Sequence, residues 1–402
     1  MGTRSLHQKQ DTSESTSVLA ELIYPYSREA FLQEVWTQKS VYLTGGGTRR
    51  FDDLLSWATL SELLNHHDFE YPTLRLAKNG QVLAPVENAN FLKHCQEGAT
   101  LILDRVHKFV PEIARFATAF RSEIGHPVQV NLYGSWPGIQ GFKCHYDTHE
   151  VFILQVDGSK TWSIFADTVK YPLDDQKSAL QPPPEGAPES VWTLEAGDIL
   201  YIPRGHWHYA VATDGPSLHL TVGVTSQTGL SFVEWVSEQL RDRVRWRENL
   251  PLLSEAEPVS LRHRLHELIA ELNDYLNDES VVSAYESYLA QAGKPAVRYA
   301  FPYQVGFGIF AEGRKTQFYR PPYQRVQISE LEGDRGYQIL ASGKEITLAG
   351  VPKSFVETLF STDNFSGLDV SEWLPDYDWE IDLVPLLSRL VTEGVIFVAK
   401  DC

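Results

Sequence analysis

The sequence predicts an α+β protein in which an antiparallel β-sandwich or barrel forms the centre and helices flank it. Between residues 126 and 226, short β-type runs alternate with Gly- and Pro-containing turns, as in sandwiches and barrels. From 229 to 292, apolar residues recur at spacings of three and four, which is typical of amphipathic helices. The chain has 402 residues, too many for one ordinary core, so two or three domains are expected.

Residues 1–18 are polar and lack an apolar segment, which predicts a disordered tail rather than a secretory signal. Residues 19–125 mix helical and strand patterns, with a helix over Phe31–Trp36, a strand over Ser40–Thr44 and one or two helices within Asp104–Arg121. The glycines at 45–47 predict a turn, because the Lys-Ser/Thr pair and the helix of a phosphate-binding loop do not follow them.

The central region carries the strand predictions. Asp157-Gly158 lies between two strand-like runs and predicts a β-hairpin there. The Pro-rich stretch from Gln181 to Pro188 predicts a surface loop. The predicted strands are Val128–Tyr133, Val151–Val156, Thr161–Phe165, Val191–Leu194, Ile199–Ile202 and Leu218–Val224.

The last third of the chain predicts helices and then a mixed region. Phe232–Val244 and Leu261–Leu276 have helical periodicity. Leu383–Glu393 is predicted as a helix, followed by Gly394 and a strand over Val395–Ala399, an order that occurs in winged-helix units. From residue 326 onward acidic residues outnumber basic ones 14 to five, whereas a DNA-reading winged helix should be basic.

Composition limits the partners. The net charge of −18 disfavours nucleic acid, so no direct nucleic-acid binding is expected. No run of 18 or more apolar residues occurs, so no transmembrane helix is expected. The three cysteines, Cys95, Cys144 and Cys402, are too few and too far apart for a disulfide framework or a four-thiolate zinc site, which favours a reducing cytoplasm.

One motif points to a metal. His145 and Asp147 are two residues apart, and in an extended chain such residues point to the same side, so both can bind one ion. Two histidines and one carboxylate form the site of non-haem Fe(II) oxygenases, and His208, after the turn at Pro203-Arg204-Gly205, is the candidate third ligand.

Other nearby residues compete for these roles. His206 would share a face with His208 and is the less favoured ligand. His149 is four residues from His145, roughly 13 Å along a strand, so a second layer or the substrate side suits it better. Cys144 alternates away from His145 and is predicted to be packed in the interior.

These segments resemble the JmjC ribosomal oxygenases, cupin-fold enzymes that hydroxylate ribosomal proteins. The shared pattern is His-Tyr-Asp, then Val-Phe-Ile-Leu-Gln, Gly-x-Lys-x-Trp and Gly-Asp-x-Leu-Tyr-x-Pro-Arg-Gly-x-x-His. It is specific over residues 128–224, and only the order of modules is similar elsewhere. The resemblance implies a double-stranded β-helix (cupin/JmjC jelly roll) within residues 19–226, a helical dimerisation region over 227–300, a winged-helix-like domain over 301–402, and a homodimer.

The resemblance also implies roles for residues. His145, Asp147 and His208 would hold Fe(II), with 2-oxoglutarate as cosubstrate and O2 as oxidant. Lys160 would pair with the distal carboxylate of 2-oxoglutarate, although the pattern alone would suit an exposed hairpin lysine. Asn131, Tyr133 and Thr221 would lie near the cosubstrate. Thr221 shares a face with His219, and these two could otherwise be a satisfied polar pair within the barrel. Cys144 stands where the animal enzymes usually have proline, and His149 also departs from them, which leaves the substrate open.

The implied function is an Fe(II)- and 2-oxoglutarate-dependent oxygenase that hydroxylates an arginine or histidine side chain of a protein or peptide, such as a ribosomal protein; demethylation is less expected. An oxygenase acting on a small molecule or a biosynthetic precursor peptide is the main alternative. A zinc- or manganese-loaded cupin acting as hydrolase or isomerase, and a non-catalytic adaptor that uses the acidic C-terminal module, are less favoured functions.

Overall fold

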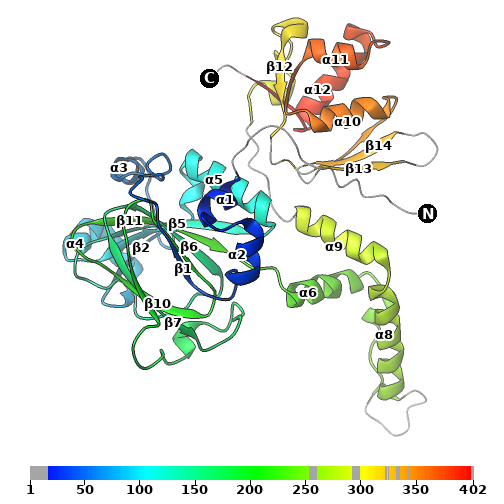
Figure 1. Cartoon of the computed structure of the whole chain (residues 1–402). Helices are drawn as coiled ribbons and strands as arrows, with labels where there is room; N and C mark the ends of the chain where they lie inside the picture. Colours follow the sequence, from blue (N-terminus) through cyan, green and yellow to red (C-terminus); the bar gives the residue numbers. More distant parts are fainter. Residues whose placement is uncertain are drawn as a thin grey trace. The chain divides into compact units, whose positions relative to one another are not determined.

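The computed structural model describes residues 17–252, 260–291, 299–321, 324, 326–331, 336–341 and 344–399. The chain divides into two compact units, Met1–Ser226 and Gln227–Cys402 (Figure 1). Of the predicted tail, residues 1–16 lie outside the described residues, as does Cys402, while Ser17 caps the first helix. The domain boundaries expected from the sequence remain predictions.

Two antiparallel sheets form the first unit. The main sheet has the order β1-β9-β6-β11-β5-β4-β2-β3, and the second has the order β10-β7-β8. The strands are β1 (Val41–Leu43), β2 (Leu74–Lys78), β3 (Gln81–Val82), β4 (Thr100–Leu103), β5 (Val128–Ser135), β6 (Glu150–Asp157), β7 (Lys160–Asp167), β8 (Ser190–Leu194), β9 (Ile199–Ile202), β10 (His206–Ala212) and β11 (Ser217–Val224).

The outer face of the main sheet is apolar and is covered by helices. On β5 and β11, the alternate residues Val130, Leu132, Leu220 and Val222 are fully buried in the largest core cluster. That cluster also contains Phe31 and other side chains of the helices that flank the sheet. The helices of this unit are α1 (Val18–Ile23), α2 (Arg28–Glu34), α3 (Trp57–His66), α4 (Phe91–Gln96) and α5 (Pro111–Ile124), and α1, α2 and α5 contribute to the cluster (Figure 1).

The opposite face of the main sheet carries polar side chains along two paired strands. Asn131 pairs with Thr221, Tyr133 with His219 and Ser135 with Ser217, so their side chains share this face. A second core cluster joins β6 and β9 of the main sheet to β7 and β8 of the other sheet. The two sheets therefore pack face to face, and the polar row lies on the inner side of a β-sandwich.

The hairpin predicted at Asp157-Gly158 is wrong. Strand β6 pairs with β9 and β11, whereas β7 pairs with β8 and β10, so the turn carries the chain from one sheet to the other. Gly158 has φ +66, and a Cβ there would lie 2.0 Å from the carbonyl oxygen of Pro216. A side chain at this position would clash with the Pro216 carbonyl, and the positive φ also favours glycine.

The second unit begins with helices α6 (Gly229–Leu240), α7 (Val244–Arg247), α8 (Leu261–Leu276) and α9 (Glu279–Gln291). The predicted helix Leu261–Leu276 is confirmed, whereas the one predicted to reach Val244 ends at Leu240. Trp235, Val236, Leu240 and Val281 form the buried cluster of this region.

The C-terminal region has its own core and two three-stranded sheets among its described residues, β16-β12-β17 and β13-β14-β15. The predicted helix near 383–393 and the strand after it are confirmed as α12 and β17; the winged-helix assignment stays a prediction. No helix of the described residues is long and apolar enough to span a membrane. The elements are β12 (Gln317–Tyr319), β13 (Val326–Glu330), β14 (Tyr337–Ala341), β15 (Lys344–Leu348), α10 (Lys353–Ser361), β16 (Asn364–Ser366), α11 (Gly367–Trp373), α12 (Val384–Thr392) and β17 (Phe397–Val398).

Candidate metal centre and cosubstrate site

His145, Asp147 and His208 meet in the first unit, with one donor atom from each lying within 4.8 Å of the others. His145 and Asp147 lie in the segment just before β6, and His208 lies on β10 of the second sheet. The 145–147 segment is not part of a regular strand, and only His145 forms an isolated bridge there, with His208. The two segments nevertheless deliver two imidazoles and one carboxylate to one point.

Backbone hydrogen bonds hold these two segments together. The amide of His145 donates to the carbonyl of His208 at 3.0 Å, and the amide of His208 donates back at 2.7 Å. The amide of Gly205 donates to the carbonyl of Asp147 at 3.0 Å. A register shift in the β7–β10 pairing between His206 and His208 separates these two residues, and His206 is not part of the metal-type group.

The hydrogen bonds of the two imidazoles fix which nitrogen can bind a metal. Nδ1 of His145 lies 2.8 Å from the carbonyl oxygen of Lys143, and Nδ1 of His208 lies 3.0 Å from that of His206. A carbonyl only accepts, so each Nδ1 carries the proton and each Nε2 keeps a free lone pair. This arrangement orients metal-binding histidines in proteins.

Burial and neighbouring charges shift the pKa values of two of these residues, His208 and Asp147. Burial lowers the pKa of His208 to about 4, so its imidazole is neutral at physiological pH. Burial opposes ionisation of Asp147, but the neighbouring imidazoles, His149 first, outweigh this and lower its pKa. The group therefore offers a neutral imidazole at His208 and a carboxylate at Asp147, a combination suited to a divalent cation.

A buried network beside the ligands was not apparent from the sequence. Tyr201 donates to Oε2 of Glu150 at 2.6 Å, and the amide of Arg204 donates to the same oxygen at 3.3 Å. Nε of Arg204 lies 3.6 Å from the other carboxylate oxygen. Glu150 follows the 145–147 segment and Arg204 precedes His208, so the network anchors both ligand-bearing segments.

Lys160 lies on the inner face, not on an exposed hairpin. Its side chain is buried, with the residue 6% exposed, and its Nζ donates to Oγ of Ser135 at 2.8 Å. Burial lowers its pKa to about 7. In the described part of the chain no carboxylate forms a salt bridge with this amine, so the cost of burying the charge is not offset by a protein anion.

Aromatic groups link Lys160 to the metal-type group. Nζ of Lys160 lies 5.8 Å from the ring centre of Trp162, which is 5.6 Å from the ring of His219 and 6.0 Å from that of His208. Nδ1 of His219 and Nε1 of Trp162 are buried without a hydrogen-bond partner among the described residues. Three buried polar groups on this inner face therefore lack a full complement of protein partners.

The other predicted cosubstrate residues also lie on the inner face. Tyr133 stacks on His219 with ring centres 4.8 Å apart. Burial, followed by the charge of Asp147, raises the pKa of Tyr133 well above its usual range, which keeps the phenol protonated. Oδ1 of Asn131 accepts from the amide of Arg105 at 2.8 Å and from Nε2 of Gln129 at 3.1 Å. Thr221 is buried opposite Asn131.

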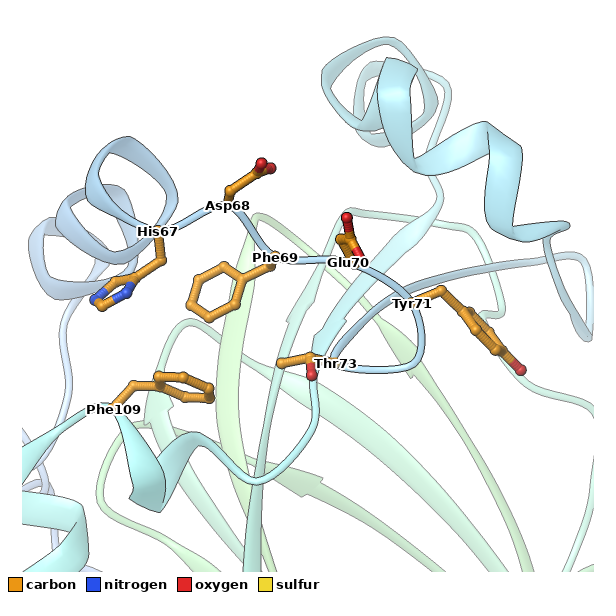
Figure 2. Close-up of a pocket in the computed structure, with 7 residues that line it drawn as sticks. All are labelled: His67, Asp68, Phe69, Glu70, Tyr71, Thr73 and Phe109. Carbon is orange, nitrogen blue, oxygen red and sulfur yellow. The ribbon is translucent and has the colours of Figure 1, made fainter.

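A shallow pocket of about 380 Å³ lies elsewhere in this unit, near the end of α3 and the start of β2. Figure 2 shows the rings of His67, Phe69 and Phe109 pointing toward one another, with the carboxylates of Asp68 and Glu70 turned away from them. Neither the metal-type group nor any predicted cosubstrate residue lines it. Its lining residues are His67, Asp68, Phe69, Glu70, Tyr71, Thr73 and Phe109.

Comparison with known proteins agrees with this site. A family model described as the JmjC domain matches residues 103–232. Mouse ribosomal oxygenase 2 is 26% identical over 338 residues, which is 79% of this chain and 70% of that protein. The chain contains a JmjC domain and is similar to the ribosomal oxygenases. The matched range contains every predicted metal and cosubstrate residue of this JmjC protein.

Other relatives match a smaller share of their own length. The bifunctional lysine-specific demethylase and histidyl-hydroxylase NO66 of Drosophila persimilis is 28% identical over 61% of this JmjC chain. The chain spans between 28% and 45% of the length of the first three curated relatives that it matches.

Solved structures share the fold. The Escherichia coli ribosomal oxygenase YcfD matches with a TM-score of 0.60 and 21% identity, over 93% of this chain and 98% of that one. Its complex with cobalt and 2-oxoglutarate matches with a TM-score of 0.61 and 20% identity, over 94% and 99%. Together with the family match, this likeness confirms the predicted cupin/JmjC jelly roll.

Proposed function

We propose that this JmjC protein is an Fe(II)- and 2-oxoglutarate-dependent oxygenase that hydroxylates an amino-acid side chain of a protein or peptide. One observation carries the proposal: the structure pairs a two-imidazole, one-carboxylate group with a buried amine that has no protein anion beside it among the described residues. A site for a metal alone needs only the two imidazoles and the carboxylate. A site for a metal together with a dicarboxylate cosubstrate needs the buried amine as well.

The residues present fit both implied groups. His145, Asp147 and His208 match the donor set of non-haem Fe(II), and the hydrogen bonds of the histidines leave Nε2 free for it. The buried amine of Lys160 fits one carboxylate of 2-oxoglutarate, and the unpartnered Nδ1 of His219 and Nε1 of Trp162 are further polar groups of the same face. The complex of E. coli YcfD with cobalt and 2-oxoglutarate supports the same pairing.

Each group of the chain has a separate task in this proposal. Bound Fe(II) would supply activation of O2, coupled to oxidation of 2-oxoglutarate to succinate and CO2. His145, Asp147 and His208 hold the metal, and Lys160, hydrogen-bonded to Ser135, orients the cosubstrate through its distal carboxylate. Tyr133, Asn131 and Thr221 line the inner face, and the protonated phenol of Tyr133 can donate a hydrogen bond to a ligand oxygen.

The proposed substrate is a protein side chain, with arginine and histidine as the favoured targets and a ribosomal protein as the favoured carrier. The names of the relatives, ribosomal oxygenase and histidyl-hydroxylase, support this choice. The net charge of −18 suits a basic partner, because opposite charges speed encounter. An oxygenase acting on a small molecule or a precursor peptide remains the main alternative.

Two functions outside oxygenase chemistry receive less support. A hydrolase or isomerase with the same metal ligands has no use for a carboxylate anchor, so burial of an uncompensated lysine would be a pure cost. A non-catalytic adaptor would have no reason to preserve both metal-binding Nε2 atoms and the buried amine. Metal analysis, together with thermal stabilisation by 2-oxoglutarate, separates these functions from an oxygenase.

The test combines turnover with product analysis. The protein is incubated with Fe(II), ascorbate, 2-oxoglutarate and total E. coli ribosomal protein, and succinate is measured with and without each component. We expect succinate formation that requires Fe(II), and a mass increase of one oxygen atom, roughly 16 Da, on a ribosomal protein when its peptides are analysed. Succinate without any oxidised protein would favour the small-molecule alternative, and no succinate would contradict the oxygenase.

We also propose a homodimer formed through the helical region of the second unit. Helix α8 exposes Leu265 and Ile269, and Ile269 is 57% exposed, although both are strongly apolar. Changing Ile269 to Glu is expected to shift the protein from dimer to monomer in light scattering, because burying an unpaired carboxylate is costly. His263→Glu, which adds a carboxylate at an exposed polar position of α8, should leave the dimer intact. A monomeric wild type would contradict the proposal.

A cytoplasmic location and the absence of direct nucleic-acid binding belong to the same proposal. Cys95 and Cys144 are both unpaired thiols, which suits a reducing compartment. Two arginines of the α7 and α8 region form ion pairs with neighbouring acids, Arg245 with Glu267 and Arg264 with Glu248. They are partly neutralised within the protein, which leaves less positive charge for a phosphate backbone.

A further inference from the structure

We infer that His149 contacts the substrate and helps to determine which side chain is accepted, with Gly223 providing the space for its ring. The inference rests on the proposed oxygenase function and deepens it by assigning the substrate side of the site. It follows from positions along β5 and β11, from the packing of the His149 ring and from its hydrogen-bonding capacity.

The positions along β11 separate a cosubstrate end from an opposite end. Ser217 pairs with Ser135, which accepts the hydrogen bond from Lys160, so the lysine end of the site lies at the start of β11. Gly223 lies six residues further along β11, roughly 20 Å at the usual rise of a strand. The two ends of this strand therefore serve different parts of the inner face.

The metal-type group lies over the middle of the same strands. His208 is linked through Trp162 to His219, and Asp147 acts electrostatically on Tyr133, the residue that pairs with His219. A cosubstrate that spans from the metal to Lys160 occupies the first half of this face. The substrate must then approach the metal from the Gly223 half.

The ring of His149 lies in that half. A Cβ placed on Gly223 would be 2.7 Å from Cδ2 and 2.8 Å from Nε2 of His149, so the ring rests directly on the glycine backbone. These distances are shorter than a packed side chain tolerates, so only glycine at 223 leaves the ring where it is. His149 is two residues from Asp147 along the chain, so the ring belongs to the segment that carries two residues of the metal-type group.

The His149 ring is free to bond a substrate. Within the described residues no hydrogen-bond partner of its imidazole is seen, and the residue is only partly buried. Gln129 of β5 pairs with Gly223, and its side chain donates to Asn131. The ring suits a polar group of a peptide, such as an amide or a side-chain N–H, because an imidazole can accept as well as donate.

A role in holding Asp147 is the competing explanation, and it predicts a different result. A residue that positions the metal ligand would change metal affinity and substrate-free succinate formation when it is replaced. A residue that contacts substrate mainly changes the concentration of substrate needed for half-maximal stimulation.

The experiment uses the full chain, with total E. coli ribosomal protein as substrate. For His149→Ala, assayed at saturating Fe(II), we expect the half-saturating substrate concentration to rise about tenfold, as for loss of one hydrogen bond, and Mn(II) affinity to change much less than that. His149→Gln should recover part of the loss, because its amide can replace one ring nitrogen.

Gly223→Ala supplies an independent check, because it displaces the ring without removing it. It should raise the half-saturating concentration, and adding it to His149→Ala should cause little further change, since both act through one contact. Unchanged substrate dependence in His149→Ala, or a fall in Mn(II) affinity that accounts for the whole loss, overturns the inference. Absence of succinate formation in the wild type, even with ribosomal protein present, would instead contradict the oxygenase function itself.

Discussion

Replacing His145 with alanine is expected to abolish 2-oxoglutarate turnover. The variant loses one of the two imidazole ligands. In the wild type, Nδ1 of His145 is hydrogen-bonded to the carbonyl of Lys143, which leaves the lone pair of Nε2 free for the metal. A metal supplies several kcal/mol of stabilisation, and about 1.4 kcal/mol corresponds to a factor of ten in rate, so succinate formation should fall about 1,000-fold or more. Succinate is measured in the turnover assay with ribosomal protein, and bound metal by mass spectrometry of the purified protein.

His206→Ala is the matched control for the loss of a metal ligand. His206 is also a buried histidine of β10, but it lies outside the metal-type group. The control should keep bound metal and most of its turnover, whereas His145→Ala should keep neither. Full turnover with normal metal content in His145→Ala would exclude the proposed centre.

Lys160→Ala is expected to weaken binding of 2-oxoglutarate without removing the metal. A hydrogen bond to a charged group contributes about 1.5–3 kcal/mol, so the dissociation constant should rise roughly 10- to 100-fold. Calorimetry with Mn(II) in place of Fe(II) measures this without turnover. Lys170→Ala, which removes an exposed lysine after the same strand, should bind as the wild type does. Equal affinity in Lys160→Ala would show that the amine does not bind the cosubstrate.

The pH dependence of cosubstrate binding should follow the same amine. Burial lowers the pKa of Lys160 to about 7, so the free protein loses this positive charge as the pH rises through 7. A bound carboxylate favours the protonated amine, so affinity is greatest below pH 7 and falls by up to about tenfold per pH unit above it. In Lys160→Arg the guanidinium stays charged, and the affinity should change little between pH 7 and 9. A wild type with the same flat profile would contradict the assignment.

The sequence predicted the parts of the site that depend on alternation within one strand. Asn131 and Tyr133 share a face of β5 because they are two residues apart, and the buried Leu132 occupies the other face. The choice of His208 over His206 also agrees with the group that the structure forms. Local geometry was sufficient in these cases, because the side-chain period of a strand is two.

Features that depend on long-range pairing could not be predicted in this way. The Asp157-Gly158 turn has the composition of a hairpin, and only the pairing of β6 with β11 and of β7 with β10 decides that it crosses between sheets. Ser135 as the partner of Lys160 and the contact of Glu150 with Arg204 join residues that are far apart in sequence. Strand β10, which begins at His206 directly after the turn at Pro203-Arg204-Gly205, was not among the predicted strands.

The buried amine of Lys160 makes the stability of the folded protein depend on the concentration of 2-oxoglutarate. Without cosubstrate, burial either isolates the charge of the Lys160 amine or forces the amine to lose its proton, whereas water solvates the charged amine in the unfolded chain. Binding of 2-oxoglutarate, a dianion, neutralises this amine. Because only the native state binds the cosubstrate, binding raises the free energy of unfolding. In cells with little 2-oxoglutarate, a larger fraction of this protein should unfold and be degraded, so its abundance would follow the concentration of its cosubstrate.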